Sequence, residues 1–289
     1  MSTWDEIRTA YHVARMGTVS GAADALGVHH ATVIRHIDSL EGRLGVKLFQ
    51  RHARGYTSTE AGKDLLQVAQ ATDDQFTQLV GRIKGRGDEV SGELVVTSLS
   101  AASPRMTPAI VKFQAQYPGL MVRYLTGDEV LRLEYGEAHV ALRAGSKPDN
   151  PDNVVQPFKS LCVSLYASQD YVARNGRPAT LDDFSGHSFV GYDNLESRAP
   201  FFRWLMERVG PEQVTFRATD NRVVRDAIAA GVGIGFVSCW DAEATDLVRL
   251  FPPQPEWSAP LWLVTHVDLH RTTKVQAFLS FLKEEAKTW

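Results

Sequence analysis

A polar, glycine-rich segment divides the sequence into two parts with different hydrophobic patterns. Residues 84–92 read Lys-Gly-Arg-Gly-Asp-Glu-Val-Ser-Gly, a composition that ends a helix and is typical of a linker. Before this segment, apolar residues recur every three or four positions, which predicts helices; after it, short strand-like runs alternate with amphipathic stretches. A chain of 289 residues has room for about two domains. We therefore expect a mainly helical N-terminal domain and a separate C-terminal α/β domain.

Composition removes several protein classes from consideration. The chain is 44% hydrophobic and 22% charged, which is ordinary for a globular protein and argues against disorder. The longest weakly polar run, residues 227–240, is shorter than the about 20 apolar residues of a membrane-spanning helix, and the first residues lack a secretory signal. Cys162 and Cys239 are too few for a disulfide scaffold or a cysteine-rich zinc site. We expect two free thiols, no metal and no cofactor, in a cytoplasmic protein that does not contact a membrane.

Residues 4–44 predict three short helices. Apolar residues at helical spacing place the first at about 4–16, and Gly17 ends it. Thr18 or Ser20 is placed to cap the second helix, and the third runs over about 30–43. The apolar stripe of the third helix consists of Val33, Ile37, Leu40 and Leu44, and its opposite face carries Thr32, Arg35, His36, Ser39 and Arg43. This order is typical of a helix-turn-helix, although a three-helix bundle without a ligand has the same periodicity.

The segment after the third helix predicts a small two-stranded wing. Residues 48–49 are strand-like, the Arg54-Gly55 pair forms a turn, and residues 56–58 form the returning strand. The net charge of the chain is -3, yet every charged residue between positions 42 and 59 is basic. A basic wing beside a helix that enters the major groove suits contacts with DNA phosphates, which add affinity without base selectivity.

These residues resemble the DNA-binding region of the LysR-type transcriptional regulators of bacteria. The similarity runs in order through residues 17–62, and its most specific parts are Leu40-Glu41-x-Arg43-Leu44-Gly45-Val46-x-Leu48-Phe49 and Thr59-Glu60-Ala61-Gly62. The resemblance implies a winged helix-turn-helix that dimerises on a promoter. The residues expected to contact DNA are Ser20, His29, His30, Thr32, Arg35, His36, Ser39, Arg43, Arg51, Arg54 and Thr57.

The third helix departs from the family pattern where base selectivity is decided. His29 and His30 stand where small polar residues are frequent, and Ile34 precedes the expected recognition arginine, Arg35. Each histidine can also be interpreted as a surface residue or a phosphate partner, and no carboxylate or cysteine cluster favours a metal role. Arg35 is the strongest single candidate for contact with a base or a phosphate.

A long helix is predicted over residues 59–86, with Thr59 as its N-cap. Apolar or small residues recur along it with alternating spacings of four and three, which is a heptad pattern. The residues of this seam are Leu65, Ala69, Thr72, Phe76, Leu79 and Ile83. The pattern predicts pairing with a second copy of the chain, as a homodimer or within a homotetramer, which presents two reading helices to pseudo-palindromic DNA.

The second half of the chain alternates strands and helices. This order implies a parallel sheet wrapped by helices, with strands expected at 93–98, 120–125 and 140–142. Three segments again resemble LysR-type regulators, namely 168–178, 229–235 and 275–282. The resemblance implies a periplasmic-binding-protein-like α/β effector domain of two lobes, joined by crossing strands near 161–165 and 261–265. The expected units are 1–58 (DNA-binding domain), 59–86 (dimerising linker helix), 87–92 (hinge), 93–160 with 268–289 (lobe one) and 161–267 (lobe two).

In such a fold a ligand binds between the lobes, at the carboxyl ends of strands. The hydroxyl groups of Ser98 and Ser100, with the N–H groups of the following helix, suit an anion, and Arg143 is placed to pair with a carboxylate. The expected effector-binding residues are Ser98, Ser100, Thr126, Arg143, Phe202, Asp220, Asn221 and Phe236. Each serine or threonine can also be an ordinary helix cap, and Arg143 can instead form a salt bridge between the lobes.

Motifs that would indicate catalysis are not found. The run Gly231-x-Gly233-x-Gly235 follows a predicted helix and precedes a strand, the reverse of a dinucleotide-binding loop, so we expect a helix-to-strand turn. No nucleophile elbow, zinc-protease or Walker motif is present, and we do not expect an enzyme. We expect a transcriptional regulator that binds double-stranded promoter DNA, a small anionic effector and itself, with RNA polymerase as a further candidate partner. The alternatives are a solute-binding receptor and a DNA-binding protein without a ligand.

Overall fold

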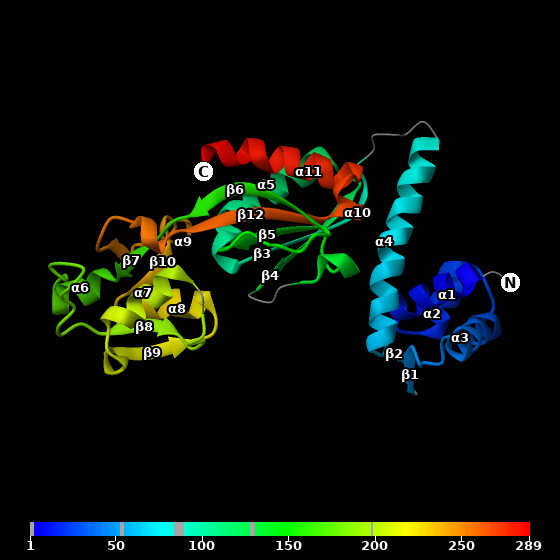
Figure 1. Ribbon diagram of the computed structural model, residues 1–289, viewed down its shortest axis with the longest axis horizontal. Helices are drawn as coiled ribbons and strands as arrows, with labels where there is room; N and C mark the ends of the chain where they lie inside the picture. The colour runs from blue at the N-terminus through cyan, green and yellow to red at the C-terminus, as the bar shows by residue number, and fades with distance from the viewer. Residues whose placement is uncertain (1–2, 53–54, 84–89, 128–130, 198) are drawn as a thin grey trace.

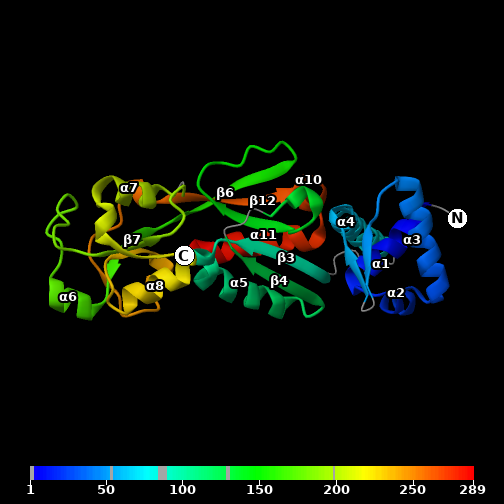
Figure 2. The same cartoon turned by 90° about the horizontal axis from the view of Figure 1, so that it is seen from below.

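Three bodies follow one another along the chain in the computed structural model, which describes residues 3–52, 55–83, 90–127, 131–197 and 199–289. A helical domain and the long helix α4 lie at one end, a five-stranded sheet with its helices lies in the middle, and a second α/β lobe lies at the other end (Figures 1 and 2). The chain enters the far lobe through one strand, returns through another and ends on the central lobe. Residues 87–89, half of the expected hinge, lie outside the described residues.

The N-terminal domain has the predicted winged helix-turn-helix fold. Its elements are α1 (Thr3–Met16), α2 (Val19–Leu26), α3 (His30–Leu44), β1 (Phe49–His52) and β2 (Gly55–Ser58). Gly17 has φ +69°, so a left-handed turn separates α1 from α2, and the Thr18 hydroxyl caps α2 by accepting a hydrogen bond from Gly21 N at 3.1 Å. The buried core contains the predicted stripe residues Val33, Ile37 and Leu40, packed with Ala10 and Val13 of α1. Leu44, at the end of α3, is exposed.

Helix α4 (Glu60–Ile83) follows the wing. The Thr59 hydroxyl accepts a hydrogen bond from Gly62 N at 3.2 Å, which caps the helix as predicted. α4 packs along α1 on one side and contacts the short helix η2 (Leu133–Tyr135) of the central lobe on the other. None of the described helices, α4 included, is both long and apolar enough to cross a bilayer.

The central lobe, lobe one, is built on a five-stranded sheet. The strand order is β4-β3-β5-β12-β6, with β3 (Gly92–Ser98), β4 (Leu120–Thr126), β5 (Val140–Ala144), β6 (Asn153–Leu161) and β12 (Ala259–His266). Helices α5 (Ser103–Gln116) and α11 (Thr273–Glu285) pack against each other, and the ring centroids of Phe113 and Phe278 lie 5.1 Å apart between them. The short elements of this lobe, besides η2, are η1 (Ser100–Ala102), α10 (Val267–His270) and η5 (Ala286–Thr288).

The far lobe, lobe two, contains two small sheets around an aromatic core. Its strands are β7 (Val163–Ala167), β8 (Phe189–Tyr192), β9 (Val214–Ala218), β10 (Gly235–Ser238) and β11 (Val248–Arg249), in the orders β10-β7-β11 and β8-β9. Its helices are α6 (Gln169–Asn175), α7 (Pro200–Arg208), η3 (Pro211–Gln213), α8 (Asn221–Ala229), α9 (Cys239–Ala242) and η4 (Pro255–Trp257). The glycine run at 231–235 connects α8 to β10, so the prediction of a helix-to-strand turn is confirmed.

The sheet of lobe one differs from the predicted parallel sheet. β3 pairs in parallel with β4 and β5, but β12 runs antiparallel to both β5 and β6. The strand that returns from lobe two enters the sheet from the opposite end, and this reverses its direction relative to β5. Residues 259–266 therefore lie in the sheet of lobe one, whereas the sequence analysis assigned 161–267 to lobe two.

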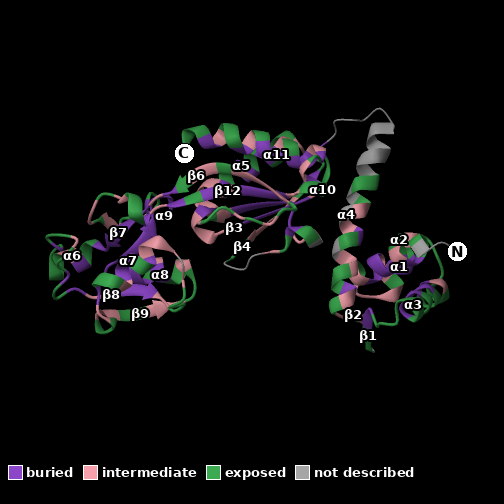
Figure 3. Ribbon diagram, viewed as in Figure 1, coloured by how far each residue is buried: buried purple, intermediate pink, exposed green. Residues whose placement is uncertain are grey.

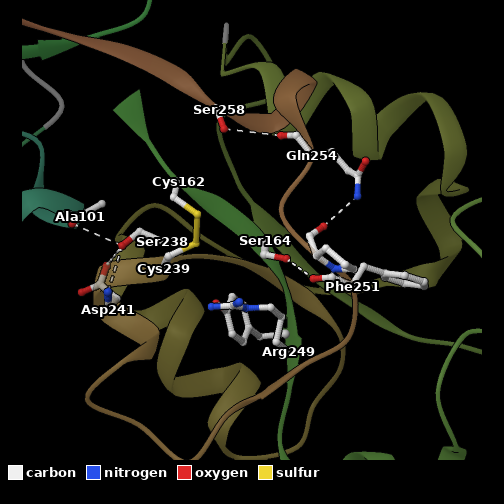
Figure 4. Close-up of a disulfide and its surroundings, with 12 residues drawn as sticks. Ala101, Cys162, Ser164, Ser238, Cys239, Asp241, Arg249, Phe251, Gln254 and Ser258 are labelled. Carbon is white, nitrogen blue, oxygen red and sulfur yellow. Dashed lines mark hydrogen bonds between the residues drawn. A yellow bond between two sulfur atoms is a disulfide. The ribbon is translucent and has the colours of Figure 1, made fainter. Parts of the chain in front are cut away.

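The expectation of two free thiols is wrong. Cys162 and Cys239 form a disulfide, with their Cα atoms 5.4 Å apart (Figure 4). β7 and β10 pair antiparallel with Ser238 opposite Val163, so the next step along the ladder brings Cys239 beside Cys162. The two positions are 77 residues apart in sequence, and no local pattern indicates that they meet.

Candidate functional site

Helix α3 presents one exposed side at the edge of the molecule (Figure 3). His30, Ala31, Ile34, Arg35 and Asp38 are exposed and recur at helical spacing; we call this set the outer face of α3. The opposite side of the helix is packed inside the domain and buries Val33, Ile37 and Leu40, so the outer face is the part of α3 that remains available to a ligand. His29 precedes the helix and is also exposed. Among the described residues, no group of three or more His, Cys, Asp or Glu side chains is placed to hold a metal ion.

Three residues of α3 that are expected to contact DNA bond to α1. His36 is buried there, which corrects the sequence analysis, whereas Ser39 and Arg43 remain exposed. The His36 ring is buried, and its Nδ1 lies 2.8 Å from Thr9 Oγ1. The Ser39 hydroxyl donates to Glu6 Oε1 at 2.8 Å, and Arg43 forms an ion pair with the same carboxylate. α1 crosses α3 on this flank, and the helical spacing of α3 alone does not show which flank a neighbouring helix covers. His36 therefore belongs to the helix interface, and Arg35 remains on the outer face.

The wing is tied to α3 by Glu41, a residue that the sequence analysis assigned no role. Its Oε1 accepts hydrogen bonds from the backbone N–H groups of Leu48 (2.9 Å) and Phe49 (3.2 Å), and its Oε2 from Lys47 Nζ (2.7 Å) and Arg51 (3.3 Å). Burial raises the pKa of Glu41, but these hydrogen bonds outweigh burial and hold the pKa below its ordinary value. The sequence offered one indication of this role, which is that Glu41 is a carboxylate next to the apolar stripe of α3.

Not all of the wing residues that are expected to contact DNA are available, because one of them already bonds to other side chains of the domain. The guanidinium of Arg51 donates to Asp38 at 2.5 Å and also contacts Glu41, and the hydrogen bond that Asp38 accepts raises the pKa of Arg51. Arg51 therefore links the wing to the outer face of α3. Thr57 on β2 and Ser20 on α2 are exposed and Thr32 is half-buried, whereas Arg54 lies outside the described residues.

Much of the predicted dimer seam on α4 faces α1 of the same chain. Ala69 is buried, Leu65 packs on the N-terminal core, and the Phe76 ring lies 5.4 Å from that of Trp4. The Thr72 hydroxyl bonds to a carbonyl of its own helix, and the side chains of Leu79 and Ile83 lie outside what the structure describes. A groove of about 230 Å³ remains open between α1 and α4, lined by Trp4, Ile7, Arg8, Tyr11, Ala69, Asp73 and Phe76. The apolar spacing of α4 is thus explained in part by packing within one chain.

Several predicted effector residues gather at the ends of strands in lobe one. Ser98 lies opposite Thr126 where β3 and β4 end, and Ser100 begins η1. Ser98 is buried; its hydroxyl donates to the Leu99 carbonyl at 2.9 Å and lies 2.7 Å from the Tyr124 hydroxyl. Thr126 is exposed and Ser100 is half-buried. Ser98 is therefore already bonded within the fold, and the more accessible hydroxyl groups are those of Ser100 and Thr126.

Arg143 lies near the end of β5 and is half-buried. Its guanidinium donates to the Leu131 carbonyl at 2.6 Å. Burial lowers the pKa of Arg143, and the nearby carboxylate of Glu134 acts in the opposite direction. Among the described residues, no carboxylate forms a salt bridge with Arg143. Arg143 therefore places a partly buried cation near the end of a strand, and a guanidinium has five N–H donors.

The predicted residues of lobe two divide into two groups. Asp220 is exposed and caps α8 by accepting a hydrogen bond from Arg222 N at 2.7 Å, and Asn221 begins that helix. Phe202 and Phe236 are buried in the core of lobe two, against Tyr192 and against Trp204 and Trp257 respectively. They are therefore core residues and not walls of a cleft, because both side chains point into their own lobe.

Comparison with known proteins identifies the family. Residues 4–63 match the family described as bacterial regulatory helix-turn-helix protein, lysR family, and residues 87–287 match the LysR substrate binding domain. The chain belongs to the LysR family. It is a transcriptional regulator with an effector-binding domain, and not an enzyme.

Three curated relatives cover most of the chain. A transcriptional repressor of Pseudomonas aeruginosa is 27% identical over 295 residues, covering 96% of this chain and 90% of the relative. The regulator CrgA of Neisseria meningitidis is 25% identical over 291 residues (97% and 96%), and the activator IlvY of Salmonella typhimurium is 29% identical over 239 residues (80% and 81%). A repressor and an activator thus both occur among the relatives of this chain.

Solved structures of full-length regulators share the fold. ArgP from Mycobacterium tuberculosis aligns with a TM-score of 0.72 at 17% identity, covering 97% of this chain and 96% of that chain. CbnR in complex with its target DNA aligns with a TM-score of 0.62 at 19% identity, covering 99% and 100%. At these identities the likeness concerns the fold, a winged helix-turn-helix joined to a two-lobed α/β domain.

Proposed function

We propose that this LysR-family regulator binds promoter DNA through α3 and the wing, under the control of a small anionic effector bound between its two lobes. The observation that carries the effector part is Arg143, a half-buried guanidinium bonded to a backbone carbonyl at the end of a sheet strand. Charge-assisted hydrogen bonds to a carboxylate or phosphate are the strongest that such a group forms. Ser100 and Thr126 add accessible hydroxyl groups at the same end of the sheet.

Lobe two supplies the opposite wall of the proposed cleft. Helix α8 contacts η1 across the lobe boundary, so Asn221 and Asp220 at the start of α8 are candidates for the second set of contacts. An effector held by both lobes favours the state in which the lobes are closed, because it binds that state more tightly than the open one. We propose that this closure changes how the dimers pack and thereby how far apart their reading helices lie on bent DNA.

Arg35 is the proposed base-reading or phosphate-binding residue of the outer face of α3. His29, His30, Thr32, Ser20 and Thr57 are proposed as neighbouring DNA contacts. Arg51 is proposed to act together with Asp38, which orients it. A major groove accepts one helix with side chains directed at base edges, which matches a helix with one exposed side.

We also propose how the protein assembles and where it acts. We propose a homodimer or homotetramer in the cytoplasm, with RNA polymerase as a candidate partner at the promoter. We keep the expected domain boundaries, except that residues 259–267 join lobe one. The two-fold symmetry of a dimer suits a pseudo-palindromic operator.

Three measurements test this proposal. Arg35→Ala is expected to weaken operator binding by about 1–3 kcal/mol if Arg35 reads a base, and to weaken all duplexes alike if it holds a phosphate. A thermal-shift screen of anionic metabolites is expected to find a ligand that raises the melting temperature of the protein but not of Arg143→Gln. Footprints of identical length with and without that ligand would contradict the proposed change in dimer packing.

A further inference from the structure

Cys162 occupies the connection between the two lobes. Leu161 is the last residue of β6 and pairs with Ala259 in the sheet of lobe one, whereas Val163 is the first residue of β7 in lobe two. Cys162 is therefore the one residue between the two strands, at one of the two crossings that connect the lobes. Figure 4 shows its side chain directed at Cys239, which begins α9.

The fold holds the two cysteines together independently of the bond between their sulfur atoms. The backbone N–H of Cys239 donates to the carbonyl of Cys162 at 2.9 Å, which continues the antiparallel ladder of β7 and β10. Their Cα separation of 5.4 Å lies within the usual range for a disulfide. The thiols therefore remain adjacent when reduced, so the disulfide forms and breaks without unfolding of the strands.

The segment that follows Cys239 carries contacts between the lobes. Trp240 packs its ring against Trp289 at the C-terminus of lobe one, with 5.7 Å between centroids. Glu243 forms a salt bridge of 2.5 Å with Arg105 of α5, and the hydroxyl of Ser238 donates to the Ala101 carbonyl at 3.4 Å. A covalent bond from Cys239 to the connecting residue thus ties the contact segment 238–243 to the hinge.

We propose that Cys162 and Cys239 are a reversible oxidation site that locks the hinge between the lobes. With hydrogen peroxide as oxidant, one thiolate attacks a peroxide oxygen and forms a sulfenic acid with release of hydroxide. The other thiol attacks the sulfenic sulfur, forming the disulfide with release of water. A dithiol reverses the reaction by two thiol–disulfide exchanges and is itself oxidised to a disulfide.

Two observations favour a switch over a permanent cross-link. Cys162 is half-buried whereas Cys239 is buried, so Cys162 is the more accessible residue of the pair. Disulfides outside oxidising compartments are mostly transient and redox-sensing, and a DNA-binding regulator acts where DNA is kept. This second argument rests on the DNA-binding role proposed above; the position at the hinge does not.

The test uses the full-length protein in the absence of DNA. It is reduced with dithiothreitol, reoxidised with hydrogen peroxide, and each state is analysed by disulfide mapping and hydrogen exchange. We expect a Cys162–Cys239 linkage that forms and is cleaved in the folded protein. We also expect slower exchange in peptides covering residues 99–105 and 238–245 after oxidation, roughly tenfold, because the open state is less populated. The double variant Cys162→Ser/Cys239→Ser is expected to show the same exchange before and after peroxide.

Three outcomes would overturn the proposal. If peroxide treatment produces no linkage between the two cysteines, they are not an oxidation site. A linkage that resists dithiothreitol until the protein is denatured makes the disulfide a permanent cross-link. If the contact segment exchanges hydrogen at the same rate in the reduced and oxidised protein, the disulfide does not lock the hinge. Because none of these measurements involves DNA or an effector, they remain informative if the proposed function fails.

Discussion

The attachment of the wing to α3 depends on one carboxylate, which makes Glu41 the most informative position to perturb. Its side chain is buried and accepts two backbone and two cationic hydrogen bonds from the segment 47–51. Glu41→Ala removes the acceptor for Leu48 N and Phe49 N while leaving both groups inside the domain. Glu41→Gln retains an acceptor oxygen but removes the charge, and Lys47→Ala removes only an exposed partner.

The expected loss in the free energy of unfolding depends on the type of contact that each substitution removes. A buried donor that loses its acceptor costs about 1–3 kcal/mol, and a buried ion pair broken on one side costs about 3–5 kcal/mol. Lys47 and Arg51 keep access to water, so the lower part of that range applies and we expect about 3 kcal/mol for Glu41→Ala. For Glu41→Gln we expect about 1–2 kcal/mol, and for Lys47→Ala less than about 1 kcal/mol.

Hydrogen exchange of the full-length protein measures this cost locally. A loss of about 3 kcal/mol corresponds to roughly a 100-fold faster exchange in peptides that cover the wing, since 1.4 kcal/mol is a factor of ten. Peptides from lobe one and lobe two serve as the internal control. A change of less than about threefold for Glu41→Ala would refute the assignment of Glu41 as the anchor of the wing.

The pH dependence gives an independent check on the same residue. Because the folded-state pKa of Glu41 lies below its ordinary value of 4.5, the ionised carboxylate contributes stability above pH 4.5. That contribution is lost as the pH falls through the folded-state pKa. The difference in stability between the protein and Glu41→Gln is therefore expected to be full at pH 7 and to shrink in acid. A difference that stays constant down to the acid transition would contradict this reasoning.

Three further predictions follow from the packing and the proposed cleft. A Cβ at position 62 would overlap a backbone carbonyl of the wing, so Gly62→Ala should cost about 1–3 kcal/mol in thermal unfolding, whereas Gly42→Ala, in open space on α3, should stabilise by about 0.5–1 kcal/mol. His36→Ala should destabilise the N-terminal domain by about 1–3 kcal/mol yet leave base preference unchanged in a binding-site selection, because its ring faces α1. Arg143→Gln should weaken effector binding by calorimetry about tenfold to 100-fold without changing DNA affinity in the absence of effector, and an unaltered effector affinity would remove Arg143 from the cleft.

Local chemistry in the sequence determined the elements of the DNA-binding domain. The spacing of Val33, Ile37 and Leu40, the glycine at position 17 and the caps Thr18 and Thr59 each act within a few residues, so the helices, the wing and the family resemblance were predictable. The same holds for the alternation of strands and helices that indicated an α/β domain, whereas its division into two lobes was implied by the resemblance to LysR-type regulators.

Only the tertiary structure decided which surfaces of those helices and strands are covered by other parts of the chain. Glu6 and Ser39 are 33 residues apart in sequence, and Cys162 and Cys239 are 77 residues apart. The spacing of neighbouring residues predicts neither contact. The direction of β12, the burial of Phe202 and Phe236, and the contact of Phe76 with α1 likewise depend on which elements come to lie against each other. Periodicity shows that a residue has a buried or an exposed side, but the packing partner, and therefore the role of the residue, is set by contacts between distant segments.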